Sequence, residues 1–73
     1  MARISGIISV VQESRFRLST GDGRSIIFTL AGDATLEPQD LQSLVSGPEV
    51  EIIFSAQSGR KAMTAHCIRE AGP

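Results

Sequence analysis

The chain has 73 residues, of which 41% are hydrophobic and 21% charged, and its formal net charge at pH 7 is −1. This size and composition predict a single folded domain over residues 1–73 and do not fit a largely disordered chain. A net charge near zero argues against a surface built throughout to bind phosphates, and no apolar run approaches the roughly 20 residues that cross a membrane. The single cysteine, Cys67, excludes an internal disulfide, and we expect a cytoplasmic protein.

Charge is distributed unevenly along the chain. Residues 1–30 carry four arginines against two acidic residues, and residues 31–53 carry five acidic residues and no basic one. Residues 54–73 carry three basic residues against one acidic residue. This pattern fits ordinary solvated charge, and it fits equally a protein with separate basic and acidic faces.

Residues 3–12, RISGIISVVQ, are rich in isoleucine and valine and predict a first strand. Within it, Gly6 is the expected position of a bend or bulge. Apolar side chains occupy both faces of this strand, with Ile4, Ile8 and Val10 on one face and Ile7 and Val11 on the other.

The segment from Glu13 to Leu30, ESRFRLSTGDGRSIIFTL, predicts a β-hairpin, because apolar residues alternate with polar ones on both sides of a glycine-containing turn. A two-residue loop would place the apolar residues of the two strands on opposite faces. A three-residue loop of Gly21, Asp22 and Gly23 aligns them and supplies a glycine for the left-handed position of a bulged turn. The resulting register pairs Phe16 with Phe28 and Leu18 with Ile26.

This register places two arginines on the outer face of the hairpin. Arg15 lies opposite Thr29 and Arg17 opposite Ile27, with Arg24 at the hairpin tip. We therefore expect three guanidinium groups along one edge of the domain.

Residues 36–47 predict a helix that packs against the sheet. Pro38 suits the first helical position after a cap at Glu37, Asp40 lies in the first turn, and Gly47 ends the helix. The apolar face of this helix consists of Leu41, Leu44 and Val45.

Two further strands follow. In residues 49–56, EVEIIFSA, the side chains of Val50, Ile52 and Phe54 point inward. In residues 61–70 an even-length loop before the strand, either 57–60 or 58–59, puts Met63, Ala65 and Cys67 inside and leaves Thr64 and His66 outside. The opposite parity would bury Thr64 and His66, and we favour the first arrangement.

The predicted element order is three strands, a helix and two strands within about 70 residues. This is the element order of the OB-fold. We therefore predict an all-β, five-stranded, OB-like Greek-key barrel with one short helix between strands three and four. In this fold the outer face of strands two and three commonly binds ligands, and Arg15 and Arg17 would project from it.

Several residues recur in the order seen in one group of these barrels. They are Gly6, Phe16, Arg17, Leu18, Gly23, the GPEVEI segment at 47–52, Gly59, Arg60 and Arg69. Over about residues 5–69 the layout resembles bacterial translation initiation factor one and related ribosomal-protein-type RNA-binding barrels. The resemblance implies a small RNA- or ribosome-binding factor, although this chain departs from it in its acidic helix region, its negative charge and its lack of Tyr and Trp. Its topology is also similar to small molybdate-binding barrels, without their serine and lysine segments.

We therefore expect a binding module whose first candidate partner is RNA or single-stranded DNA. Because all three phenylalanines fall on inward-facing positions, base stacking is largely missing and binding should be weak and salt-dependent. The alternative is a protein partner or a homo-oligomer, since isoleucines are also expected on the outer face. The candidate phosphate-contacting residues are Arg15, Arg17, Arg24, Arg60 and Lys61.

No residue set in the sequence indicates catalysis, a cofactor or a metal site. His66 and Cys67 are adjacent in a strand, so their side chains point to opposite faces and cannot form a nucleophile and base pair. A single histidine with scattered acidic residues does not indicate metal binding. We expect His66 at the surface, Cys67 in the core, and no enzymatic activity.

Overall fold

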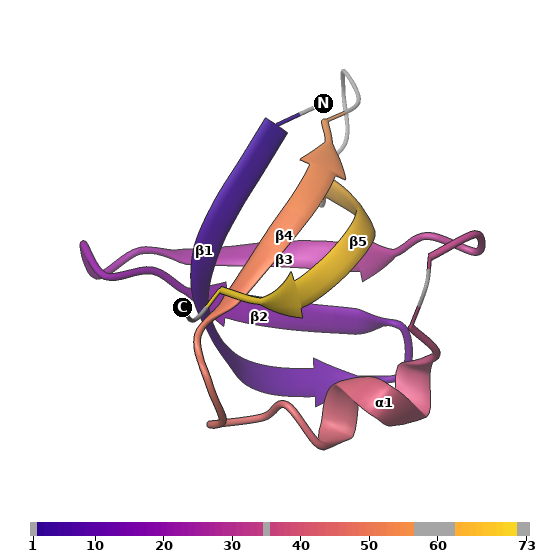
Figure 1. Ribbon diagram of the computed structural model, residues 1–73, viewed down its shortest axis with the longest axis horizontal. Coiled ribbons are helices and arrows are strands. Elements are labelled where there is room, and N and C mark those ends of the chain that lie inside the picture. The colour runs from indigo at the N-terminus through magenta and orange to yellow at the C-terminus, as the bar shows by residue number, and fades with distance from the viewer. Residues whose placement is uncertain (1, 35, 57–62, 72–73) are drawn as a thin grey trace.

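The computed structural model describes residues 2–34, 36–56 and 63–71, which form five strands and one short helix. The strands close into a barrel in the order β1-β2-β3-β5-β4, with β3 and β5 parallel and the other pairs antiparallel. This confirms the predicted all-β OB-like barrel with a helix between β3 and β4 (Figure 1). The elements are β1 (Ala2–Gln12), β2 (Arg15–Ser19), β3 (Ser25–Leu30), α1 (Pro38–Gln42), β4 (Val50–Ser55) and β5 (Met63–Glu70).

The β2–β3 hairpin has the predicted register. Phe16 pairs with Phe28, and Leu18 pairs with Ile26. At the turn, the Thr20 amide donates to the Arg24 carbonyl at 2.9 Å, which leaves the three-residue loop 21–23. Gly23 has φ +89°, the left-handed conformation that this turn requires.

We expect Gly23→Val to destabilise the protein by about 1 to 2 kcal/mol, because a β-branched residue is strained at positive φ. A Cβ at this position meets no atom within 4 Å, so the effect reports backbone conformation rather than packing. Urea unfolding followed by circular dichroism measures it. Gly23→Asn should cost less, because asparagine tolerates the left-handed region. Equal stability of the valine variant and the wild type would contradict the turn.

β1 is shared between two neighbours. Residues 2–6 pair with β4 and residues 7–12 pair with β2. At the crossover, a Cβ added to Gly6 would lie 2.5 Å from the Ser19 carbonyl oxygen, so the glycine permits close approach of β1 to β2. The bulge itself is at Ser9, which is the extra residue between Ile8 and Val10.

Because of this bulge, the side chains of β1 after Ser9 face the opposite way from the prediction. One extra residue reverses the alternation of side chains, so residues after Ser9 exchange faces. Val11, not Val10, therefore continues the inward face of Ile8, and Val10 is 48% exposed. The expected grouping of Val10 with Ile4 and Ile8 is wrong.

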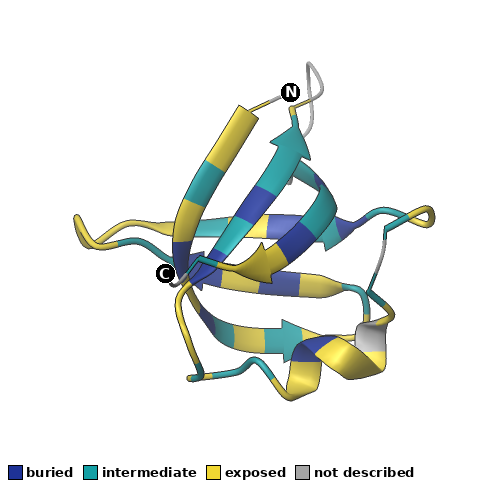
Figure 2. Ribbon diagram, in the orientation of Figure 1, coloured by how far each residue is buried: buried dark blue, intermediate teal, exposed yellow. Residues whose placement is uncertain are grey.

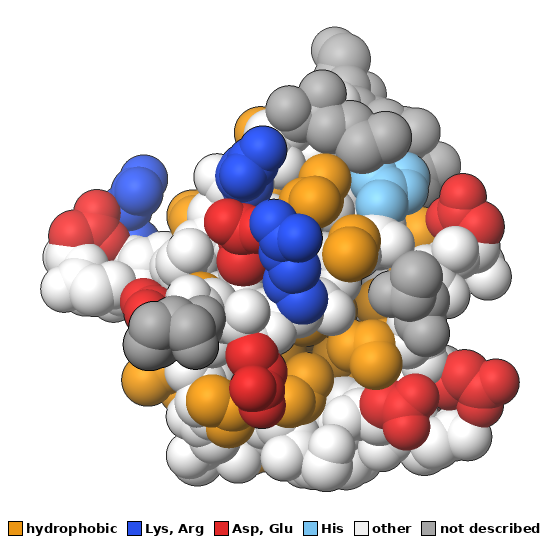
Figure 3. Space-filling view, in the orientation of Figure 1, with side chains coloured by type: hydrophobic (Ala, Val, Ile, Leu, Met, Phe, Trp, Pro, Cys, Tyr) orange, Lys and Arg blue, Asp and Glu red, His pale blue; other side chains and the backbone are white. Residues whose placement is uncertain are grey.

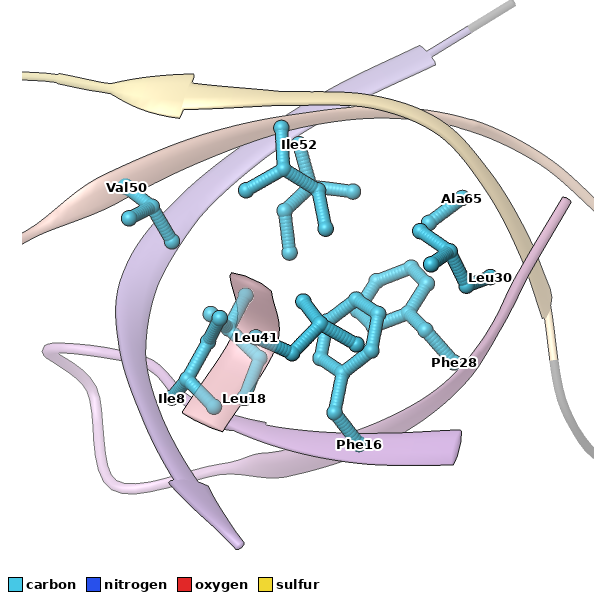
Figure 4. Close-up of a cluster of buried hydrophobic side chains, with 10 residues drawn as sticks. Ile8, Phe16, Leu18, Phe28, Leu30, Leu41, Val50, Ile52 and Ala65 are labelled. Atoms are coloured by element: carbon cyan, nitrogen blue, oxygen red, sulfur yellow. The ribbon is translucent and has the colours of Figure 1, made fainter. Parts of the chain in front are cut away.

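Inward-facing residues of all five strands fill the barrel, and buried bands alternate with exposed ones along the strands (Figure 2). Phe16 and Phe28 stack with ring centroids 5.4 Å apart, and Phe54 meets Phe28 edge-on at 5.2 Å. The helix contributes Leu41 to this cluster (Figure 4). The buried core consists of Ile8, Phe16, Leu18, Phe28, Leu30, Leu41, Val50, Ile52, Ala65 and Ile68.

The helix is shorter than the predicted range of 36–47. α1 ends at Gln42, and the chain continues through tighter turns in which the Leu44 amide donates to the Leu41 carbonyl. The Ser46 amide donates instead to the carbonyl of Ile8 in β1, at 2.8 Å, and Ser46 has φ +56°.

A helix that could span a lipid bilayer is not found within the part of the chain that is described.

A second bulge, in β5, makes the side chains after it face the opposite way from the prediction. Ile53 pairs with Cys67 and Phe54 with Ala65, so His66 is the extra residue on β5. The alternation therefore reverses, and Ile68 rather than Cys67 joins Ala65 in the core. Cys67 is half-buried opposite Ile53, contrary to the expected core position. The predicted loop at 57–60 lies outside the described residues.

Candidate nucleic-acid interface

Cross-strand pairing aligns side chains in rows over the outer face of β1, β2 and β3. Arg17 lies between Val10 of β1 and Ile27 of β3, and this row depends on the bulge at Ser9. In the next row Arg15 lies between Gln12 and Thr29. The two arginines are therefore on one face, in adjacent rows, as the sequence predicted.

The two arginines of this face differ from other arginines of the barrel in their charge environment. Arg15 and Arg17 are exposed, and neither forms an ion pair with any residue of 2–34, 36–56 or 63–71. By contrast, the Arg69 guanidinium donates to the Glu51 carboxylate at 2.6 and 2.9 Å, and Arg3 approaches the same carboxylate at 3.9 Å. Basic and acidic side chains are interleaved in Figure 3, over a part of the surface where charges are paired. Among the residues that the structure describes, no acidic side chain neutralises the positive charge on the outer face of β2.

A shallow hollow lies beside these arginines, and we call it the apolar slot. Its volume is about 140 Å³. Val10 and Ile27, which are 48% and 47% exposed, contribute apolar side chains to it, while Phe16 is only 2% exposed. The lining residues are Val10, Gln12, Arg15, Phe16, Arg17 and Ile27. The slot combines apolar side chains with two cationic groups.

A second hollow adjoins the slot at the β1–β2 turn, and we call it the polar hollow. Its volume is about 540 Å³, and it shares Gln12 and Arg15 with the apolar slot. Its remaining lining comes from Glu13, Ser14 and Thr29. The two hollows are therefore neighbours that meet at Gln12 and Arg15.

Arg24, a third predicted basic residue, does not join this face. Arg24 lies at the hairpin tip, where its Nε donates to Asp22 at 2.9 Å. A hydrogen bond from the Thr20 hydroxyl, together with the charge and hydrogen bonds of Arg24, lowers the pKa of Asp22 below its ordinary value. Asp22 therefore remains ionised at neutral pH and partly neutralises Arg24. Arg60 and Lys61 lie outside the described residues.

The structure also brings together three polar side chains that the sequence analysis did not connect. Ser55 Oγ and His66 Nε2 are 2.8 Å apart, and His66 Nδ1 is 3.8 Å from a carboxylate oxygen of Asp33. This is the order of groups in a Ser-His-Asp hydrolase site, but the His66–Asp33 separation exceeds a hydrogen bond and the Asp33 side chain is 85% exposed. Together, these three residues bring the loop after β3 next to β4 and β5.

No group of three or more potential metal-ligating side chains is found among the described residues.

Comparison with protein-family models, curated proteins and solved structures gives no match to this chain.

Proposed function

We propose that this barrel is a non-enzymatic module that binds single-stranded nucleic acid on the outer face of β1, β2 and β3. The observation that supports this most directly is the pair Arg15 and Arg17, exposed on one face and unpaired with the described residues. Guanidinium groups bind phosphates through paired hydrogen bonds, and OB-folds commonly bind oligonucleotides on this face. RNA is the first partner to test, because the sequence layout resembles RNA-binding barrels.

Phosphate contacts should supply most of the affinity. All three phenylalanines of the chain pack in or against the core, so none of them lies exposed on the outer face of β1, β2 and β3 as a stacking platform. For single strands, two phosphate contacts give a slope of about −1.4 in log affinity against log salt concentration. Raising salt from about 50 to about 200 mM should then weaken binding about sevenfold.

The test is fluorescence anisotropy of labelled single-stranded RNA and DNA oligomers at several salt concentrations. We expect Arg15→Gln with Arg17→Gln to remove most of the binding and most of its salt dependence. The matched control is Arg3→Gln with Arg69→Gln, which removes the same charge from arginines paired with Glu51. Absence of wild-type binding at high micromolar protein, or equal losses in the two double variants, would contradict the proposal.

A second candidate function is protein interaction or self-association through the same face. Its support is that Ile7, Val10 and Ile27 are 43%, 48% and 47% exposed on β1 and β3. Exposed apolar side chains beside charged ones are typical of protein-binding surfaces. Sedimentation velocity over a wide concentration range tests self-association, which should increase with concentration and decrease in Ile27→Ser. A monomer at every concentration would exclude a homo-oligomer.

A further inference from the structure

We propose that the apolar slot holds one unstacked base of the bound strand, with aliphatic side chains and a guanidinium group replacing the aromatic platform that the chain lacks. This inference rests on the proposed function and specifies how the ligand is held. Arg17 is the central residue, because it lies between Val10 and Ile27 in one cross-strand row. The expected ligand unit is one base with its adjoining phosphate.

The lining of the slot suits a flat, partly apolar ring. Val10 and Ile27 leave about half of their surface exposed, so a ring placed against them would remove apolar surface from water. Bases splayed out of single strands stack on arginine guanidinium planes as well as on aromatic rings. Arg17 therefore supplies the planar group, and its two neighbours supply apolar contact on either side.

The size of the slot limits what it can take. Its volume of about 140 Å³ lies below the roughly 300 to 1,000 Å³ of sites that enclose a drug-sized ligand. A single ring system is therefore the appropriate occupant. A folded protein loop would have to spread well beyond the slot to gain comparable contact.

The polar hollow gives the strand a path away from the slot. Arg15 belongs to both hollows, so a phosphate next to the bound base would lie within its reach. Beyond Arg15 the lining includes Ser14 and Thr29, whose hydroxyls can hydrogen-bond a sugar or a phosphate oxygen. Glu13 also borders this hollow, and its negative charge disfavours a second phosphate there. The face should therefore hold a short stretch of strand.

The test separates base contact from backbone contact with two probes of equal length, a natural oligonucleotide and an abasic sugar-phosphate oligomer, each as RNA-type and DNA-type. The variant is Val10→Thr with Ile27→Thr, which keeps β-branched side chains but removes apolar surface. The control is Ile7→Thr, because Ile7 is 43% exposed on β1 and does not line the slot. Circular dichroism verifies that each variant is folded.

We expect the double threonine variant to bind the natural oligomer about fivefold more weakly, the lower end of the effect of losing one stacked base. Its salt slope and its affinity for the abasic oligomer should match those of the wild type, and Ile7→Thr should change neither the salt slope nor this affinity.

If the wild type binds but the double threonine variant binds the natural oligomer equally well, or loses affinity for both oligomers equally, the slot holds no base while the proposed function stands. If a labelled polyglutamate peptide binds more tightly than the oligonucleotide and is lost in the threonine variant, the slot is a peptide site. Failure of the wild type to bind any oligomer overturns both proposals.

Discussion

Phe28→Ala is expected to destabilise the barrel by about 3 to 5 kcal/mol, a larger effect than any other substitution considered. Phe28 is fully buried, and its ring contacts those of Phe16 and Phe54 at centroid distances of 5.4 and 5.2 Å. Removing it leaves a cavity between two aromatic rings and removes both aromatic contacts. A domain of this size has a total stability of only about 4 to 11 kcal/mol, so the substitution should remove a large fraction of it.

Urea unfolding followed by far-UV circular dichroism measures this effect, since the chain has no Trp or Tyr to serve as a fluorescent reporter. Phe28→Leu provides a graded comparison, because it retains most of the apolar volume and should cost less than the alanine variant. Val10→Ala serves as the surface control, since Val10 is 48% exposed. A loss below about 1 kcal/mol for Phe28→Ala would show that the ring is not part of a tightly packed core.

The sequence contains enough local information to predict the β2–β3 hairpin. Two strands of alternating apolar residues leave few possible registers, and only the three-residue loop places Phe16 and Phe28 on the same face. Arg15 and Arg17 follow from the same parity, because each lies beside an inward-facing residue. The outward position of Arg15 and Arg17 was therefore predictable, and so was the burial of Phe16 and Phe28.

The bulges were not predictable in the same way. Ser9 and His66 are each one extra residue in a strand, and neither is marked by glycine or proline. Their positions depend on which strands lie alongside, a long-range property that a periodic pattern does not contain. The errors at Val10 and Cys67 both have this origin, because each residue follows a bulge immediately.

The same limitation explains what was missed at the site. The apolar slot needs Val10 on the outer face beside Arg17, which the uninterrupted alternation of β1 did not give. The contact between Ser55 and His66 joins residues 11 positions apart across the β4–β5 pair, and His66 is itself the bulged residue. The sequence also could not predict which arginines form ion pairs. Arg69 pairs with Glu51, whereas Arg15 forms no ion pair within the described part of the chain, and this difference depends on side-chain neighbours in space.

Gly6→Ala is expected to produce the second largest loss of stability, about 1 to 3 kcal/mol, through overpacking. The added methyl would lie 2.5 Å from the carbonyl oxygen of Ser19 and 2.9 Å from the Leu18 side chain, distances that require β1 and β2 to separate. Because the first contact is with backbone, a change of rotamer cannot relieve it. Gly32→Ala is the matched control, since its added methyl meets nothing within 4 Å.

The Gly6 substitution also connects the fold to the proposed binding face. The row that contains Val10 and Arg17 spans β1 and β2, so moving these strands apart should widen the apolar slot. We therefore expect folded Gly6→Ala protein, at low temperature, to bind single strands more weakly than the Gly32→Ala control while keeping its salt slope, because Arg15 and Arg17 both remain on β2. Unfolding and anisotropy measurements on the same samples distinguish the two effects. If the Gly6→Ala variant has the stability and the affinity of the wild type, then β1 and β2 do not approach closely at Gly6.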